Sequence, residues 1–303
     1  MTTPKPSAIE DRRQITLARV AGEGEPLAEQ VVGEGHPTAD LRIALVQAAT
    51  IWRDAAANRT LYGDLVLNLK GAADVIVLPE TFTSGFGQDA IVSAEGMDGP
   101  SVAWLRELAA QADAVITGSM LIADNGIVFN RLLWAQPDGG LHWYDKRHLF
   151  RMANEHLRYG EGHERRIFEV RGWRVLPQIC YDLRFPVFSR NRWHGEPPRA
   201  DYDLALYPAN WPTPRRHAWR TLLRARAMEN LAYVVGVNRV GVDGNDLHYS
   251  GDSAVIDPAG NPMIELGAQA QTAVVTLSAQ ALASHRERFP AWMDADDFSL
   301  SMD

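Results

Sequence analysis

The sequence predicts an α/β domain with mixed sheets, on the strength of three observations. Short apolar runs alternate with amphipathic helical stretches from Leu41 onward, and the last part of the chain reads as consecutive hairpins. Alternating strands and helices build parallel sheets, whereas hairpins add antiparallel strands, so both kinds of pairing are expected. The 303 residues and 46% hydrophobic content suit one globular domain without a long linker.

The first half of the domain is predicted to alternate between strand and helix. Asp54 can cap a helix with Leu61, Leu65 and Leu69 at four-residue spacing. Pro100 suits the first turn of a second helix, with Val102, Leu105 and Ala109 on one side. Turns are expected at Asn125-Gly126 and Asp138-Gly139-Gly140. The predicted strands cover residues 41–47, 75–78, 114–119 and 128–134.

The second half repeats this pattern and then closes with antiparallel strands. A helix is expected over 219–233, with Leu223, Ala227 and Leu231 on one face. In both halves an apolar strand ends in polar residues, at Leu78-Pro79-Glu80 and Tyr207-Pro208-Ala209-Asn210, which hints at an internal duplication. The predicted strands cover residues 175–179, 204–207, 234–238, 252–257, 263–266 and 272–277.

Residues 1–40 differ from the rest of the chain. They are rich in Gly, Glu, Pro and Thr, contain no aromatic residue and show little periodicity. Such a composition does not bury enough apolar surface to order a segment. We therefore expect a flexible N-terminal extension over 1–40 and a single folded domain over 41–303.

Charge and composition exclude several classes of partner. The formal net charge of −8 argues against a nucleic-acid surface or an anionic-membrane anchor. No apolar run approaches the length of a transmembrane helix, and no secretory signal is visible. One cysteine excludes an internal disulfide, which fits a reducing compartment. We expect a cytoplasmic protein that acts on a small molecule.

The common signatures of nucleotide-binding proteins, serine hydrolases and zinc hydrolases are absent. The sequence has no glycine-rich dinucleotide motif after a strand, no P-loop, no Gly-x-Ser-x-Gly and no His-Glu-x-x-His. The nine histidines lack ligand spacing, and one cysteine cannot build a thiolate zinc site. We expect neither a metal nor an organic cofactor.

Cys180 stands where a nucleophile would be expected. The predicted strand 175–179 leads into a sharp turn over 181–186, and a helical stretch follows. Such a corner lifts the side chain out of the sheet and leaves unpaired backbone N–H groups, which favour a thiolate and an adjacent oxyanion. The alternative is a small buried hydrophobic residue, the usual role of a single cysteine.

Glu80 is the strongest candidate for a base. It follows the predicted strand 75–78 at the sheet edge where ligands bind in α/β proteins. Phe82 and Phe86 are expected to desolvate it in part, as suits a general base, and Phe86 is also a candidate pocket residue. An exposed glutamate in a turn is the alternative.

Lys146 lies in a segment, 143–150, that alternates aromatic and charged residues. A strand with one face on a cavity would have this pattern, and its lysine could hold an oxyanion and depress the pKa of the cysteine. The alternative is a solvated cation paired with Asp145. Glu155 could orient the other groups or a water, or could be a surface residue.

Several residues could form the rest of a binding site. Arg184 and Arg151 offer planar guanidinium groups that can bind a substrate carboxylate, although surface or helix-capping roles stay open for both. Asn210 and Trp211 follow the predicted strand 204–207 and could line a pocket wall or stabilise the sheet edge.

Glu80, Lys146 and Cys180, in this order, resemble the Glu–Lys–Cys set of the nitrilase, or carbon–nitrogen hydrolase, superfamily. The likeness spans about residues 41 to 289. The motifs Asp-Lys-Arg-His-Leu-Phe and Cys-Tyr-Asp-Leu-Arg-Phe-Pro are most similar to those of the omega-amidase branch. The matching blocks are residues 78–82, 144–150, 179–186, 207–212, 224–230 and 249–253.

The resemblance implies an α-β-β-α four-layer sandwich over 41–303 that pairs into a homodimer or a higher homo-oligomer. It implies catalytic roles for Glu80, Lys146 and Cys180, with Glu155 as an auxiliary glutamate. The implied reaction releases ammonia from the terminal amide of short dicarboxylic monoamides such as 2-oxoglutaramate, through a thioester. The residues expected to contact substrate are Phe86, Tyr181, Arg184, Asn210 and Trp211.

Two other functions remain open at this point. A nitrile- or N-carbamoyl-cleaving carbon–nitrogen hydrolase would use the same three residues with a different pocket. A non-catalytic binding protein would keep the fold and leave the thiol unreactive. A redox sensor is disfavoured, because the chain has no second cysteine to resolve an oxidised one.

Overall fold

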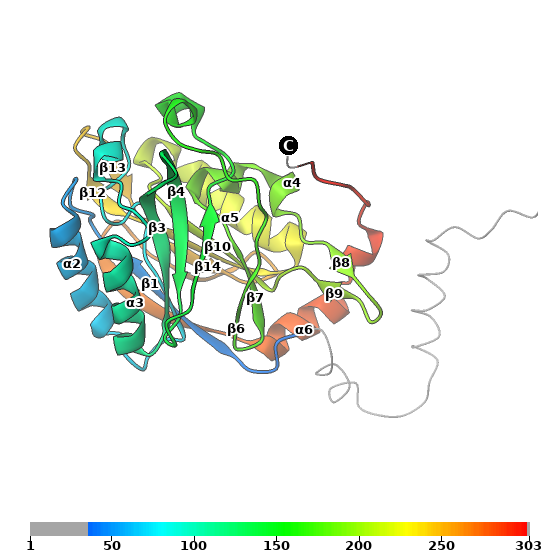
Figure 1. The fold of residues 1–303 in the computed structure, drawn as a ribbon. Helices are drawn as coiled ribbons and strands as arrows, with labels where there is room; N and C mark the ends of the chain where they lie inside the picture. Colours follow the sequence, from blue (N-terminus) through cyan, green and yellow to red (C-terminus); the bar gives the residue numbers. More distant parts are fainter. Residues whose placement is uncertain (1–35, 302–303) are drawn as a thin grey trace, which may run out of the picture.

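The computed structural model describes residues 36–301, and helices alternate with strands from Leu41 onward (Figure 1). The predicted extension over 1–40 lies outside the described residues except for 36–40, so the domain boundary stays a prediction. Within the described range, no helix is long and apolar enough to cross a membrane.

The first sheet comes mainly from the N-terminal half of the chain. Its strand order is β16-β1-β2-β3-β4-β5, with β1, β2 and β3 parallel and the remaining pairs antiparallel. Apolar side chains cover both faces of β1, as expected for a strand between two layers. The strands are β1 (Leu41–Gln47), β2 (Val75–Val77), β3 (Val115–Asp124), β4 (Ile127–Ala135), β5 (Leu141–Asp145) and β16 (Gln271–Leu277).

The second sheet repeats the arrangement of the first. Its order is β15-β14-β11-β10-β7-β6, with β7, β10 and β11 parallel and the outer pairs antiparallel. Both sheets thus have three parallel strands between one antiparallel strand and one antiparallel pair, which agrees with an internal duplication. The strands are β6 (Phe168–Val170), β7 (Trp173–Pro177), β10 (Leu204–Ala209), β11 (Tyr233–Asn238), β14 (Ala254–Ile256) and β15 (Pro262–Glu265).

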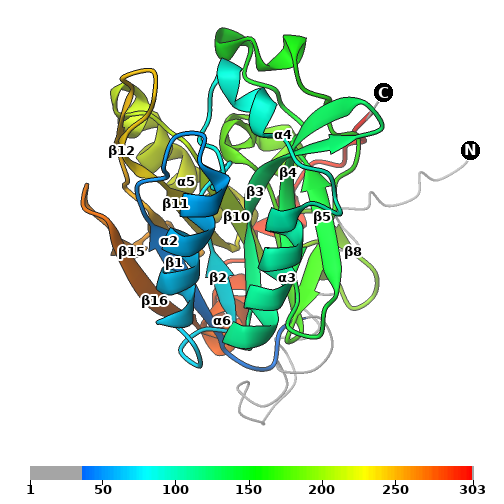
Figure 2. The same ribbon diagram turned by 60° about the vertical axis from the view of Figure 1, so that its left-hand side comes forward.

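Helices cover the outer face of each sheet. In Figures 1 and 2, α2 (Ala55–Leu67) and α3 (Pro100–Ala112) lie side by side over the first sheet. Helices α5 (Arg216–Asn230) and α6 (Ala279–Arg288) bury apolar side chains in the core of the second sheet. A continuous apolar core fills the space between the sheets. The predicted α-β-β-α sandwich is confirmed.

Short elements complete the described chain. Two small hairpins stand apart from the main sheets, and brief 3-10 turns mark the loops at the strand ends. These elements are β8 (Trp193–His194), β9 (Arg199–Ala200), β12 (Val240–Val242), β13 (His248–Ser250), α4 (Pro186–Ser189), η1 (Gln88–Ser93), η2 (Arg151–Ala153), η3 (Glu155–Leu157), η4 (Cys180–Arg184), η5 (Thr213–Arg215) and η6 (Ala291–Asp294).

Two expectations about the elements need correction, and one helix was missed. Helix α2 is capped by Asp54 as predicted, but its buried face holds Asn58, Tyr62 and Val66, because Asn58 and Tyr62 hydrogen-bond to the preceding loop. The last strand does not close the second sheet; β16 pairs antiparallel with β1 in the first. Helix α6 was not predicted from the sequence.

Candidate active site

Glu80 lies where β2 ends, and its carboxylate reaches from the first sheet to the second. Thr81, the next residue, has a φ of +42°, and its N–H donates to Ser119 Oγ of β3 at 2.9 Å. This turn leaves Glu80 only 1% exposed. Its Oε2 accepts the backbone N–H of Asn210, at the end of β10, at 2.8 Å. The alternative of an exposed turn residue is therefore wrong.

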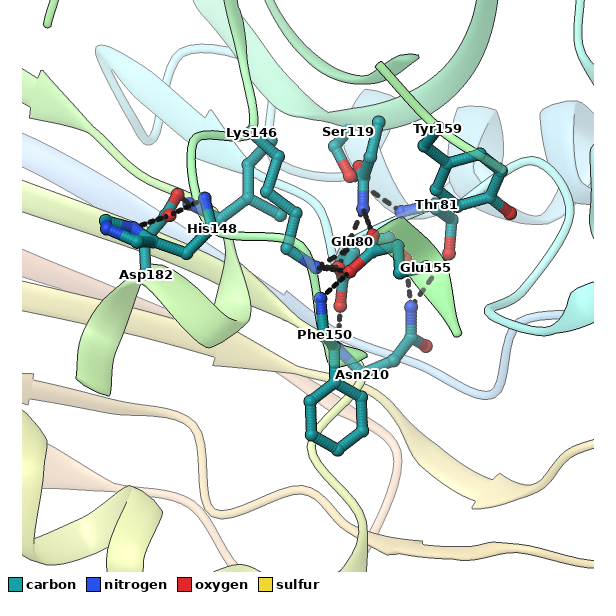
Figure 3. A network of polar contacts seen from close by, with 12 residues as sticks. Glu80, Thr81, Ser119, Lys146, His148, Phe150, Glu155, Tyr159, Asp182 and Asn210 are labelled. Carbon is teal, nitrogen blue, oxygen red and sulfur yellow. Dashed lines mark hydrogen bonds and ion pairs between the residues drawn. The ribbon is translucent and has the colours of Figure 1, made fainter. Parts of the chain in front are cut away.

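Lys146 follows β5 directly and pairs with two glutamates (Figure 3). Its Nζ lies 2.9 Å from Glu80 Oε1 and 3.0 Å from Glu155 Oε2, and all three side chains are buried. Burial alone would lower the pKa of Lys146, but the charges of Glu155 and Glu80 raise it above its ordinary value. The lysine is thus a buried ammonium ion, whereas Asp145 pairs with Arg131.

Glu155 lies behind Lys146 and is not among the residues that line the cavity beside Cys180. Its Oε2 also accepts the backbone N–H of Phe150 at 2.6 Å. Burial raises the pKa of Glu155, Lys146 opposes this, and the Glu80 carboxylate adds to the rise. These contacts suit a residue that orients Lys146 more than one that orients a water.

Cys180 sits at the corner that the sequence predicts. It begins η4, three residues after β7 ends, with a φ of +44° and an exposure of 8%. Burial raises the pKa of the thiol well above its ordinary value, and the Glu80 carboxylate raises it further, partly through a hydrogen bond with the thiol. Lys146 lowers the pKa, as expected, but does not outweigh these effects. The resting thiol therefore keeps its proton.

Glu80, Lys146 and Cys180 line one cavity, together with all five residues predicted to contact substrate. The cavity opens to solvent, and its space counted together with the open solvent at its mouth is about 520 Å³. The five residues are Phe86, Tyr181, Arg184, Asn210 and Trp211.

Two arginines line the cavity, and only one of them was predicted. The guanidinium carbon of Arg184 lies 4.8 Å from the ring centroid of Trp211, and that of Arg215 lies 5.2 Å from the ring centroid of Phe150. Neither guanidinium forms an ion pair with a carboxylate of residues 36–301. Arg151, the other candidate, is exposed and is not part of the cavity wall.

Sequence reasoning missed Asn130, Arg215 and Tyr249. Asn130 of β4 is fully buried, and its Nδ2 donates to Glu80 Oε1 at 2.8 Å. A lone amide inside the predicted strand 128–134 was the available signal. Arg215 and Tyr249 line the cavity. Tyr249 belongs to a block that carried the family resemblance, whereas Arg215 has no local signal beyond its closeness to Trp211.

Within residues 36–301, no group of three or more His, Cys, Asp or Glu side chains is placed to hold a metal ion. The donor set at the cavity contains an ammonium ion between two carboxylates, so the Lys146 Nζ already occupies the position between the acidic oxygens.

Comparison with known proteins identifies the family. A model of the carbon–nitrogen hydrolase family matches residues 42–287. The chain belongs to the carbon–nitrogen hydrolase family. This hydrolase is 50% identical over 261 residues to omega-amidase YafV of Escherichia coli (strain K12), covering 86% of this chain and 98% of that protein. It is 33% identical over 225 residues to 2-oxoglutaramate amidase of Bacillus subtilis (strain 168), covering 73% and 85% of the two chains.

A solved structure gives the same family and fold. The carbon–nitrogen hydrolase XC1258 from Xanthomonas campestris, solved with an arsenic adduct in its active site, is 60% identical and superposes with a TM-score of 0.85. The match covers 87% of this chain and all of that one. The predicted superfamily and its omega-amidase likeness are confirmed, and the chain is an amidohydrolase.

Proposed function

We propose that this amidohydrolase uses Cys180 as its nucleophile and releases ammonia from the terminal amide of short dicarboxylic monoamides such as 2-oxoglutaramate. The observation that carries the proposal is the convergence of Glu80, Lys146 and Cys180 in one cavity. The same cavity presents two guanidinium groups that pair with no carboxylate of residues 36–301. The names of the relatives support the amide and the 2-oxo acid.

Acylation begins with a proton transfer from Cys180 to Glu80. The raised pKa of the thiol favours this route over a preformed thiolate, because the thiol and the carboxylate are hydrogen-bonded. The sulfur then attacks the amide carbon, a C–S bond forms, and the carbonyl oxygen becomes an oxyanion. The ammonium of Lys146 and the backbone N–H of Tyr181 are the donors for that oxygen; removal of one such donor costs about 3 kcal/mol.

The tetrahedral species collapses as Glu80 returns the proton to the nitrogen. The C–N bond breaks, ammonia leaves, and a thioester to Cys180 remains. Glu80 next takes a proton from a water, whose oxygen attacks the thioester carbon. The C–S bond breaks, the carboxylic acid leaves, and Glu80 returns the proton to sulfur. During both acylation and hydrolysis of the thioester, Glu155 holds Lys146 toward the cavity through its ion pair.

We assign the binding of the substrate carboxylate to Arg184 and Arg215. Each guanidinium lies against an aromatic ring, which limits its motion. Within residues 36–301 neither guanidinium is paired with a carboxylate, so each can bind one from the substrate. A carboxylate there needs no other counter-charge. The same two cations disfavour a substrate with an ammonium group at that end, so 2-oxo acid amides should be preferred over the corresponding amino acid amides.

A substrate panel tests the proposal. Ammonia release is measured side by side from 2-oxoglutaramate, glutamine, an aliphatic nitrile and an N-carbamoyl amino acid. We expect the largest kcat/KM for 2-oxoglutaramate, and no turnover of it by Cys180→Ser with the circular dichroism spectrum unchanged. Faster release from the nitrile or the carbamoyl compound would favour the other hydrolase functions. Substantial turnover by Cys180→Ser would refute the nucleophile, and a wild-type protein without turnover would favour a binding protein.

A further inference from the structure

The backbone at Cys180 is strained, and one buried carboxylate brackets it. A φ of +44° is uncommon outside glycine and costs about 1–3 kcal/mol unless neighbouring contacts impose it. The backbone N–H of Ile179 donates to Asp182 Oδ2 at 3.0 Å, and the N–H of Asp182 donates to the carbonyl of Ile179 at 3.0 Å. These two hydrogen bonds close a ring around Cys180 and impose its conformation.

The same carboxylate is bound from the segment that carries Lys146. Tyr144 Oη donates to Asp182 Oδ2 at 2.8 Å. His148 donates to Asp182 Oδ1 twice, through its backbone N–H at 2.9 Å and through Nδ1 at 2.7 Å. Tyr144 and His148 lie two residues before and two residues after Lys146. Figure 3 shows the pair of His148 and Asp182 beside the lysine.

The carboxylate at the centre of this network is enclosed, so its geometry has little freedom. Asp182 is fully buried, and the His148 ring stacks on Phe185 with centroids 3.7 Å apart and planes at 4°. Burial, reinforced by the Asp182 carboxylate, raises the pKa of Tyr144 well above its ordinary value, so this hydroxyl keeps its proton and donates. A buried carboxylate with four donors is costly to rearrange, because any lost hydrogen bond leaves a buried polar group unpaired.

We propose that Asp182 is a positioning residue that fixes the nucleophile relative to Lys146. Its carboxylate joins the turn of Cys180 to both flanks of the lysine, which the sequence separates by more than thirty residues. Asp182 is not part of the cavity wall, so it acts through the residues that it holds. This inference rests on the proposed catalytic roles of Cys180 and Lys146.

The test begins with Asp182→Asn, measured on the whole enzyme. An asparagine keeps the size of the side chain, but its NH₂ group cannot accept a hydrogen bond, so one set of donors loses its partner. We expect kcat for 2-oxoglutaramate to fall about 100-fold, as for a misplacement of catalytic groups by about 1 Å, while KM stays within about threefold. A crystal structure of the variant should show Cys180 outside the positive-φ region.

Three further variants keep the test decisive if Asp182→Asn does not fold. His148→Asn retains an N–H donor near the position of Nδ1, whereas His148→Leu removes it. We expect His148→Asn to keep several-fold more of the wild-type kcat than His148→Leu. Tyr144→Phe, which removes one donor to the same carboxylate, should lower kcat as well.

The matched control is Asp203→Asn, which alters another fully buried carboxylate. Asp203 precedes β10 at the end opposite Asn210, and it binds Arg174 and Arg286 instead of the catalytic segments. We expect a lower Tm and an unchanged kcat per folded molecule.

If Asp182→Asn behaves like this control, or if His148→Leu and Tyr144→Phe keep wild-type kcat, the positioning role is overturned. Loss of the proposed function is recognised separately, because the wild type itself would then release no ammonia.

Discussion

At the scale of single residues, the charge beside Cys180 determines when the thiol can react. Burial raises the pKa of the thiol, and the Glu80 carboxylate raises it further, because a second negative charge next to the first is unfavourable. The same carboxylate is hydrogen-bonded to the thiol and is the base in the proposed mechanism. Glu80 therefore suppresses the resting thiolate and yet makes the attack on substrate possible.

This dual role predicts opposite effects of Glu80→Gln on two measurements. Ammonia release should fall by about 10²–10⁴-fold, because the general base is lost. The pKa of Cys180 should fall, because the neighbouring negative charge is removed, so alkylation by iodoacetamide should begin to rise at a lower pH than in the wild type. Cys180→Ser gives the background, since the chain has no other cysteine. An unchanged or higher onset pH would contradict the assigned contact.

The two cavity arginines allow a test of substrate charge. Arg184→Lys and Arg215→Gln should each raise KM for 2-oxoglutaramate about tenfold or more, because a charged hydrogen bond is lost, and should leave KM for a neutral amide nearly unchanged. Arg216→Gln is the control, because Arg216 pairs with Asp252 and does not line the cavity. Equal effects on both substrates would remove the affected arginine from carboxylate binding.

At the scale of secondary-structure elements, a close approach between β3 and the residue that follows β2 fixes the turn that carries Glu80. Gly118 of β3 lies against Leu78: a Cβ built on it would be 2.8 Å from Leu78 Cβ and 3.2 Å from the Leu78 carbonyl oxygen. Leu78 lies only two residues before Glu80. A side chain at 118 would therefore displace the end of β2 and the carboxylate with it.

Gly118→Ala should consequently reduce both stability and activity. Overpacking of a well-packed core typically costs about 1–3 kcal/mol, so we expect a lower free energy of unfolding in urea together with a lower kcat. Gly63→Ala in α2 is the control, because its new Cβ would be 3.7 Å from the nearest atom of Trp104, and alanine favours a helix by up to about 1 kcal/mol. Wild-type kcat in Gly118→Ala would show that the turn of Glu80 does not depend on this contact.

At the scale of the whole molecule, a buried ion cluster ties the layers together at the end opposite the cavity. Asp203 binds Arg174 of β7 at 2.9 Å and Arg286 of α6 at 2.7 Å, so it joins a strand of the second sheet to α6. Burial would raise the pKa of Asp203, but the guanidinium groups of Arg286 and Arg174 hold it below its ordinary value.

Replacement of this carboxylate should destabilise the fold in a pH-dependent way. Asp203→Asn leaves two buried arginines without their counter-charge, which we expect to cost about 3–5 kcal/mol in urea unfolding near neutral pH. A carboxyl group with a lowered pKa stabilises the folded state above its ordinary value of 3.8 and loses that contribution progressively below it. The difference between wild type and variant should therefore shrink in acid. A difference that stays constant with pH would contradict this account.

Local patterns were enough to predict most elements and to indicate Glu80, Lys146 and Cys180 as candidate site residues. Periodicity and turn chemistry act over a few residues. They account for strands 41–47 and 75–78, the cap at Asp54, the first-turn Pro100 and the turn at Asn125-Gly126. Glu80, Lys146 and Cys180 follow strand ends, and such positions gather at one edge of a sheet. The family resemblance then supplied the catalytic roles expected of these three residues.

What only the tertiary structure decided involves residues far apart in the chain. No local pattern indicates that Leu277 of β16 pairs with Leu41 of β1, that Arg215 rather than Arg151 enters the cavity, or that Glu155 lies behind Lys146. Asp182 reads as an ordinary turn residue until Tyr144 and His148 are seen to bind it. Sequence periodicity determines which face of an element is apolar, whereas the partner of that face is chosen by packing between elements, and the site is assembled by that choice.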